Sequence, residues 1–323
     1  MSKRVLVTGA NGFIGRRMVD YLRLRGWEIT AAMRSGSESF PDGVRVVKVG
    51  TLSPTTDWAE PLRGATAVVH LAGRAHRPGE AGEDTRDLYI GDNALVPEQL
   101  ARQASAGGVR RFILMSTALT LGQSSPPGGA FNDSSPPNPP DVYAESKLEA
   151  ERRVETIAKQ TSMEWAALRP PLVYGPGVKA NMGRLIDAVK AKRFLPIPAS
   201  GAYRSYIFAD NLCDATLCLL DAVTVNGTYL VADAEAVTLP ELLTHIANAL
   251  GHGPLIIPAP SSILGLVAYV GDALELLGLP SPYNSAFHRR LASSLKMDAS
   301  RIRSELGWKP PFSLAEAMAR TVA

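Results

Sequence analysis

Short apolar runs alternate with helical patterns through the first half of the chain. Six runs rich in aliphatic and β-branched residues lie at 5–9, 28–33, 44–49, 67–72, 111–116 and 164–170. They show little alternation between apolar and polar positions, which is typical of strands covered on both faces. Strands that alternate with helices predict βαβ units with right-handed crossovers. The pattern therefore predicts an α/β fold with a doubly wound parallel sheet.

The composition and the pattern of the sequence change after Pro170. Several prolines come close together there, and helical segments separated by Gly and Pro turns follow. We expect a first domain over 1–175 and a smaller C-terminal α/β domain over 176–323, with 203–232 returning to the first. At about 150 residues per domain, a length of 323 residues agrees with two domains.

Two other segments have a distinctive composition. The stretch 124–140 is rich in Pro, Ser and Gly, so it is predicted to be a loop and a candidate lid near the site. The stretch 263–279 is apolar but contains Asp272 and Glu275. Its apolar residues follow helical spacing at Ile263, Leu266, Val267, Val270, Leu274 and Leu277. We expect an amphipathic helix packed on a core, with an interfacial membrane helix as the alternative.

Composition excludes several classes of protein. The chain is 46% apolar and 20% charged, with 34 Lys and Arg against 31 Asp and Glu spread along it, so disordered and fibrous classes are excluded and nucleic acid is not indicated as a partner. The N-terminus lacks the apolar core of a secretory signal, and Cys213 and Cys218 are expected to be reduced thiols, so we expect a cytoplasmic protein without membrane insertion. The five histidines have no metal-ligand spacing, and no metal site is predicted.

A glycine-rich turn, TGANGFIG at 8–15, joins the first strand to a helix that continues to Leu22. Glycines let the backbone turn tightly and approach a pyrophosphate, whose charge the free N–H groups and the positive helix end stabilise. This context predicts a Rossmann-type dinucleotide site, with an ordinary turn as the alternative. Its predicted binding residues are Gly9, Asn11, Gly12, Phe13, Ile14 and Gly15.

The end of the second strand bears on which dinucleotide is bound. An acidic residue there holds the ribose hydroxyls of NAD, whereas an arginine suits the extra phosphate of NADP. The stretch 32–35, AMRS, contains no carboxylate, and Arg16 and Arg17 open the first helix. We therefore expect one NAD(P)(H) per chain, with NADP(H) favoured through Arg34. The alternative is that Arg34 is a solvated loop charge.

Tyr143 and Lys147 lie in YAESK at 143–147, which opens a helix. Residues at i and i+4 share a helix face, so the ammonium is expected near the phenol. A nearby cation favours phenolate, which would bring Tyr143 toward the working range of a general acid/base. Ser116 and Thr117 end the fifth strand, where a hydroxyl can hydrogen-bond a substrate alcohol or carbonyl. The alternative is that Tyr143 and Lys147 form a surface pair.

The ordered set of motifs resembles the extended short-chain dehydrogenase/reductase family, in its NAD-dependent epimerase/dehydratase group. The motifs are TGANGFIG, AVVHLAG, RFILMST followed by Gly122, YAESK, LRPPLVYGP at 168–176 and the terminal SELGWKPPFSLAEAM. They cover nearly the whole chain. Within the group, RPPLVYGPGVKAN and YRSYIFADNL are similar to segments of UDP-glucose 4-epimerase-like proteins and of related 4-keto-sugar reductases of surface polysaccharide synthesis.

The resemblance implies roles for individual residues. Tyr143 would be the general acid/base, Lys147 would bind the nicotinamide ribose and lower the tyrosine pKa, and Thr117 would be the catalytic hydroxyl. Further cofactor contacts are implied for residues near strand ends and on a neighbouring helix, namely Leu71, Ala72, Gly73, Asn93, Ser116 and Pro170.

The resemblance also implies a nucleotide-sugar substrate, held by Asn181 and by Arg204 on a phosphate. An ion pair between Arg204 and Asp210 is the alternative for that arginine. A homodimer through the helix of Tyr143 and Lys147 is implied as well, although that helix face is partly charged.

Departures from the family pattern narrow the chemistry. Ala118 and Leu119 follow Thr117 where dehydratases usually carry an Asp-Glu pair, which argues against a 4,6-dehydratase. Thr51 replaces the usual acid after the third strand, which puts tight retention of NAD in doubt. We predict hydride transfer at sugar C4, as a 4-epimerase or a 4-keto reductase. Two alternatives stay open: a reductase of a small ketone or aldehyde, and a non-catalytic dinucleotide-binding protein.

Overall fold

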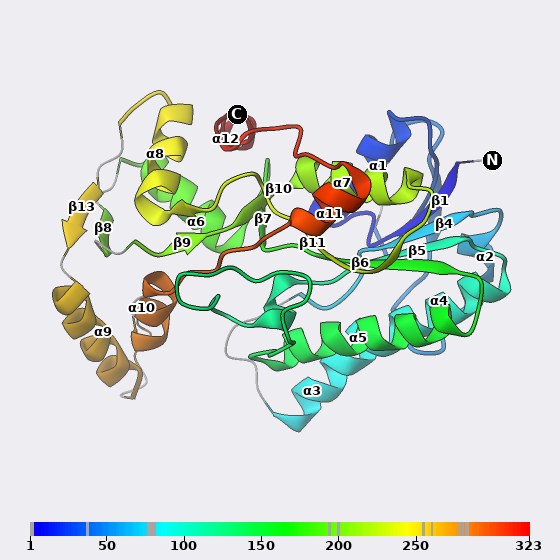
Figure 1. The fold of residues 1–323 in the computed structure, drawn as a ribbon, viewed down its shortest axis with the longest axis horizontal. Helices are drawn as coiled ribbons and strands as arrows, with labels where there is room; N and C mark the ends of the chain where they lie inside the picture. The colour runs from blue at the N-terminus through cyan, green and yellow to red at the C-terminus, as the bar shows by residue number, and fades with distance from the viewer. Residues whose placement is uncertain are drawn as a thin grey trace.

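One twisted sheet organises the larger part of the molecule (Figure 1). The computed structural model describes residues 3–36, 39–75, 82–192, 195–198, 201–253, 256–259, 261–276, 279, 281 and 284–323. Among these residues, seven strands form the sheet in the order β11-β6-β5-β4-β1-β2-β3. Their bounds are β1 Arg4–Thr8, β2 Glu28–Met33, β3 Arg45–Lys48, β4 Ala67–His70, β5 Arg111–Met115, β6 Glu164–Arg169 and β11 Asn226–Leu230. Every neighbouring pair is parallel, so the predicted doubly wound α/β fold is confirmed.

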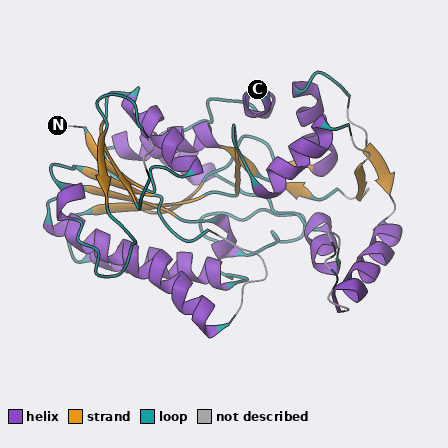
Figure 2. Ribbon diagram, turned by 180° about the vertical axis from the view of Figure 1, so that it is seen from behind, coloured by secondary structure: helices purple, strands orange, loops and turns teal. Residues whose placement is uncertain are grey.

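Helices cover both faces of this sheet, as Figures 1 and 2 show from opposite sides. One face is covered by α1 Phe13–Arg23, α7 Ala209–Asp221 and α11 Ser300–Leu306, and the other by α2 Ala59–Leu62, α4 Val96–Ala106 and α5 Val142–Lys159. The π-helical segment η1 Gly91–Leu95 joins α3 Glu83–Ile90 to α4. All side chains of β4 and β5 are buried, which explains why these strands lack an alternating pattern in the sequence.

Short paired strands and several helices form the second part, beside the carboxyl ends of the sheet strands (Figure 1). The pairs are β7 Leu172–Tyr174 with β10 Tyr206–Phe208, β9 Tyr203–Arg204 with β12 Val237–Thr238, and β8 Leu195–Pro198 with β13 Ile256–Ala259. The helices α6 Ala180–Lys190, α8 Leu239–Ala249 and α12 Leu314–Val322 pack around a second core. Both α8 and α12 start with a capping box, in which a hydroxyl and a glutamate satisfy free N–H groups at the helix start.

The segment 203–232 contributes to both parts. Its α7 and β11 complete the large sheet and its helical cover, whereas β9 and β10 pair with strands of the second part. The boundary near residue 175 stays a prediction.

The predicted loop at 124–140 is tied to the rest of the molecule. Phe131 is buried, its N–H donates to the Lys296 carbonyl at 2.8 Å, and its own carbonyl accepts from Asp298 at 2.7 Å. The carboxylate of Asp133 accepts the Leu230 N–H at 2.7 Å. These contacts describe an anchored strap rather than a free lid.

The helix predicted near residue 263 forms as α9 Ser261–Leu276, but the predicted apolar face does not pack on a core. Buried positions are Leu264, Ala268 and Gly271, whereas four of the predicted core residues are exposed: Ile263, Leu266, Val267 and Val270. The reason is that α9 packs mainly on α10 Ser285–Ala292, and one neighbour buries only a narrow stripe of a helix. Leu277 lies outside the described residues. Nowhere in the described ranges is a helix both long and apolar enough to cross a membrane.

Candidate active site

The glycine turn after β1 packs tightly against the end of β4. Gly9 has φ +65°, and a Cβ there would lie 2.8 Å from the backbone nitrogen of Ala72. A Cβ on Gly15 would lie 2.1 Å from the Gly9 carbonyl oxygen. These two close approaches explain why glycines occupy both positions.

The start of α1 is free to hold an anion. Gly12 is its N-cap and no side chain caps it, and no acidic residue occupies its first turn. The N–H groups of the first turn therefore point out of the helix without side-chain partners, and the helix dipole favours a negative charge at this position. This arrangement fits a dinucleotide pyrophosphate.

A cavity of about 600 Å³ opens beside this turn, at the carboxyl ends of β1, β2 and β4. The sheet order reverses between β1 and β4, which is where doubly wound folds bind their ligands. Predicted cofactor residues that line it are Gly9, Asn11, Gly12, Arg34, Leu71, Ala72 and Gly73. Phe13 lies at the adjoining cavity described below, while Ile14 and Gly15 continue α1.

Among the described residues that line this cavity, none next to the end of β2 carries a free carboxylate. Met33 ends β2 and is buried, and the exposed Arg34 follows it. The carboxylate of Asp92 does line the cavity, but it pairs with Arg74 at 3.1 Å. Sequence reasoning missed Arg74, although its place directly after Gly73 was an available signal.

Thr117 and Tyr143 meet at the carboxyl end of β5. Their side chains are hydrogen-bonded, and the Thr117 hydroxyl also accepts the Leu119 N–H at 3.3 Å, so its own proton is available to Tyr143. The Pro170 carbonyl accepts the Ala118 N–H at 2.9 Å and thereby fixes the turn after Thr117.

Lys147 lies on the same helix face as Tyr143 and reaches the same strand end. Its ammonium donates to the Met115 carbonyl at 3.0 Å. A Cβ on Gly73 would lie 3.4 Å from Nζ, so the ammonium adjoins the dinucleotide cavity. The three predicted catalytic side chains, those of Thr117, Tyr143 and Lys147, thus converge beside the cleft.

Burial shifts the pKa of both ionisable members. It raises the pKa of Tyr143 to about 12, and the hydrogen bond from Thr117 opposes that rise. It lowers the pKa of Lys147 to about 8, and the charge of Glu151 opposes that fall. From the sequence we expected Lys147 to lower the pKa of Tyr143. In the structure the hydrogen bond from Thr117 lowers it instead.

Asn93 holds the loop that follows Gly73. Its side-chain oxygen accepts the Arg74 N–H at 2.7 Å, and its amide donates to the Ser146 hydroxyl at 3.0 Å. Ser146 in turn donates to the Tyr143 carbonyl at 2.7 Å. Asn93 therefore links the cofactor side of the cleft to the start of α5.

Ser116 does not face the cleft as predicted. Its hydroxyl donates to Glu151 in the interior. Successive side chains of an extended strand point to opposite faces, so Thr117 and Ser116 cannot both face the same site.

A second cavity of about 850 Å³ adjoins the glycine turn. It runs from Asn11, Gly12 and Phe13 to Lys179 and Asn181 near the start of α6. Asn181 is thus placed for a ligand, whereas Arg204 on β9 is not in the lining of either cavity. Sequence reasoning missed Lys179.

Arg17 has a structural partner. Its guanidinium pairs with Asp210 at 2.6 Å. Asp210, the alternative partner considered for Arg204, is thus engaged by Arg17. The prediction that counted Arg17 toward a cofactor phosphate therefore needs correction. The two residues are 193 positions apart, and no local pattern signals the pair.

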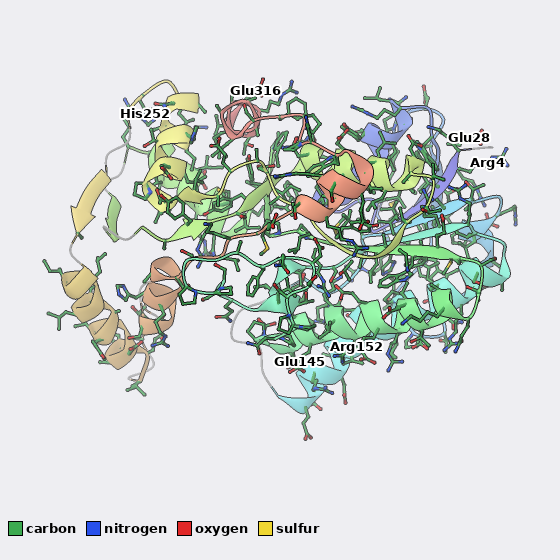
Figure 3. The ribbon with its side chains drawn as sticks, viewed as in Figure 1. Arg4, Glu28, Glu145, Arg152, His252 and Glu316 are labelled. Carbon is green, nitrogen blue, oxygen red and sulfur yellow. The ribbon has the colours of Figure 1, made fainter. Side chains whose placement is uncertain are left out.

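The outward face of α5 carries ion pairs. Glu145 and Arg152 lie along this helix in Figure 3. Arg153 pairs with Glu98 and with Glu149, and Arg86 on α3 pairs with Glu145 at 3.5 Å. This is the face on which a homodimer was predicted.

Comparison with known proteins identifies the family. A model of the NAD dependent epimerase/dehydratase family matches residues 5–232. The chain belongs to this family. It is 33% identical to a UDP-glucose 4-epimerase of Vibrio cholerae over 325 residues, which is 99% of this chain and 95% of that protein. This family member is therefore an enzyme of the extended short-chain dehydrogenase/reductase type.

Solved structures of the family share the fold. A Thermus thermophilus UDP-glucose 4-epimerase in complex with NAD matches with a TM-score of 0.73 and 24% identity, and a Bacillus cereus UDP-glucuronic acid 4-epimerase with NAD matches with 0.75 and 18%. Each match covers 99% of this chain and 97% of the other.

Proposed function

We propose that this enzyme transfers a hydride at C4 of a UDP-sugar, with Tyr143 as the general acid/base. The observation that carries the proposal is the convergence of Thr117, Tyr143 and Lys147 beside a glycine-cradled cavity. Its 33% identity over nearly full length to a protein named as a UDP-glucose 4-epimerase supports the substrate class.

The side chains divide the proton transfer between them. Thr117 can hydrogen-bond the sugar hydroxyl or carbonyl while Tyr143 takes up or returns the proton. In the structure Thr117 is the group that lowers the pKa of Tyr143, and we assign Lys147 the same effect once the dinucleotide and the sugar occupy the cleft beside its ammonium. The bound dinucleotide would supply the hydride acceptor or donor. The uncapped start of α1 and the close approach at Gly9 fit its pyrophosphate.

Arg34 supports NADP(H) as the cofactor. It is exposed and lines the cavity next to the end of β2, where the described lining residues supply no free carboxylate that would favour NAD, because Asp92 pairs with Arg74. An arginine there can hold a 2′-phosphate through charge-assisted hydrogen bonds. For the substrate, Asn181 at the second cavity and Arg204 are the proposed contacts.

Two outcomes use the same machinery. A 4-epimerase oxidises C4 and returns the hydride to the other face with a retained cofactor, and the name of the 33% identical relative favours it. A 4-keto reductase exchanges its cofactor in each turnover, and the features around Arg34 favour it.

A cytoplasmic location and a homodimer through α5 also stay proposals.

Bound-cofactor analysis separates the two outcomes. Purified protein is extracted with acid, the released dinucleotide is quantified by mass spectrometry, and protein without cofactor is titrated with NADH and NADPH. Stoichiometric NAD together with conversion of UDP-glucose supports the epimerase. Protein that arrives empty and binds NADPH more tightly supports the reductase. Absence of binding to either dinucleotide would overturn the proposal.

A further inference from the structure

A buried ionic cluster lies one helical turn beyond Lys147. Glu151 on α5 accepts two hydrogen bonds from Arg169 at the end of β6, at 3.0 and 2.6 Å, and a third from the Ser116 hydroxyl after β5. Relative exposures are 3% for Glu151, 5% for Arg169 and 4% for Ser116. The cluster therefore ties α5 to the ends of two central strands away from solvent.

The geometry of the cluster couples it to the active-site lysine. Lys147 and Glu151 are four residues apart on α5, so they occupy adjacent turns of the same face. Lys147 donates to the Met115 carbonyl, and Ser116, the next residue, donates to Glu151. Two hydrogen bonds thus join α5 to the end of β5, one from Lys147 to the Met115 carbonyl and one from Ser116 to Glu151.

Burial makes the charge balance important. Lys147 is 6% exposed, and an ammonium in such surroundings needs a counter-charge to stay ionised. Within the part of the chain that the structure describes, the ionisable groups packed around this turn are Tyr143 and Glu151 on α5, His70 on β4 and Arg169 on β6. Burial and the charge of Lys147 lower the pKa of His70 to about 3, so His70 is neutral. Among the described residues around this turn, Glu151 is therefore the carboxylate that balances the ammonium.

We propose that Glu151 is a positioning residue that acts through Lys147: anchored by Arg169 and Ser116, it fixes the helix turn that presents the ammonium to the cleft and supplies its buried counter-charge. The inference rests on the proposed function for the role of Lys147 in proton transfer. The arrangement of the cluster is independent of which sugar is bound.

The test measures Lys147 itself and needs no turnover. Trace acetylation of intact protein by acetic anhydride across a pH series, read by peptide mass spectrometry, gives the pH at which the Lys147 amine is half deprotonated. Glu151→Gln keeps the shape of the side chain and removes its charge, and should lower this midpoint by about one unit or more. Glu151→Asp keeps the charge and should restore a midpoint close to that of the wild type.

The matched control is Glu155→Gln. It removes the same charge from the same helix one turn further on, where Glu155 is half exposed and pairs with Lys159 at 2.9 Å. Solvent screens that position, so the Lys147 midpoint should not move.

Arg169→Gln tests the same proposal in the opposite direction. Without the arginine, more of the Glu151 charge acts on Lys147, so the pH midpoint of Lys147 should rise. If Glu151→Gln shows no cooperative unfolding transition and is therefore not folded, Arg169→Gln provides the test. A wild-type midpoint in a folded Glu151→Gln protein, or in Arg169→Gln, would overturn the proposal. Lack of UDP-sugar turnover by the wild type would instead refute the proposed function and leave the labelling result intact.

Discussion

The hydroxyl groups of Thr117 and Tyr143 are joined by a hydrogen bond. The Thr117 hydroxyl also accepts the Leu119 N–H at 3.3 Å and keeps its own proton to donate. Donation to the phenol oxygen stabilises phenolate, whereas burial stabilises the protonated phenol. The acid/base strength of Tyr143 is therefore set by competition between this bond, burial and the groups that a ligand brings.

Replacing Tyr143 by Phe should remove the proton transfer and keep the fold. General acid/base catalysis contributes about 10²- to 10⁴-fold, so kcat with a UDP-sugar should fall by that order while dinucleotide binding persists. Steady-state rates and fluorescence titration with NADPH measure the two effects.

Tyr89→Phe is the matched control for that variant. The Tyr89 ring packs edge-on against Tyr143 with centroids 6.2 Å apart, and its hydroxyl donates to the Ala75 carbonyl. Loss of this hydroxyl should leave kcat within a few-fold of the wild-type value. Equal losses in the two variants would contradict an acid/base role for Tyr143.

The rate should fall as the pH rises through about 8. Burial lowers the pKa of Lys147 to about 8, so the ammonium is present below this pH and is lost above it. Without the cation the phenolate of Tyr143 loses its electrostatic support. A profile of kcat/KM against pH in the free enzyme should show this alkaline limb, and Lys147→Met should lack it and be slow throughout. A wild-type rate that climbs steadily above pH 8 would refute this role of Lys147.

Arg34→Ser should discriminate between the two dinucleotides. Loss of a charge-assisted contact with the 2′-phosphate should weaken NADPH binding by about tenfold or more, with NADH binding nearly unchanged. Arg63→Ser, which removes an exposed arginine paired with Glu60 at 2.8 Å, serves as the control. Equal affinities for NADPH in wild type and Arg34→Ser would show that Arg34 is a solvated charge.

Gly15→Ala should damage the dinucleotide turn. The added Cβ would meet the Gly9 carbonyl oxygen at 2.1 Å, a backbone contact that cannot relax cheaply. We expect a loss of about 3 kcal/mol or more in the free energy of unfolding, measured in urea, together with loss of dinucleotide binding. Gly253→Ala, where a Cβ has nothing within 4 Å, should be close to neutral. Normal dinucleotide binding by Gly15→Ala would refute the proposed cradle.

Local patterns were enough to predict six of the seven strands of the central sheet, whereas β11 was not among the predicted runs. The runs that became β1 to β6 are apolar and bounded by turns, and the glycine turn is read directly from its place between a strand and a helix. The helical spacing of Tyr143 and Lys147 also predicted their shared face. Short strands such as β9 and β12, with two residues each, carry no periodic signal and could not be predicted.

Contacts between residues that lie far apart in the sequence could not be predicted. The spacing in α9 shows which residues are apolar but not which neighbour covers them, so the predicted buried face was wrong. The same limit applies to Arg17 and Asp210, and to Glu151 with Arg169, because each pair depends on how distant elements pack. Neighbouring residues of an extended chain point to opposite faces, so the inward orientation of Ser116 could be inferred only once Thr117 was known to face the cleft.

The most direct test of C4 chemistry follows a deuterium label. UDP-glucose carrying deuterium at C4 is incubated with the wild-type enzyme and with Tyr143→Phe, and the sugar nucleotides are resolved by NMR; UDP-4-keto sugars with NADPH are assayed in parallel. We expect either a C4 epimer that retains deuterium or stereospecific reduction of the 4-keto sugar, and in both cases a large loss of rate in Tyr143→Phe. Protein that binds the dinucleotide but converts neither substrate, or that converts them equally well without Tyr143, would contradict the proposed C4 chemistry.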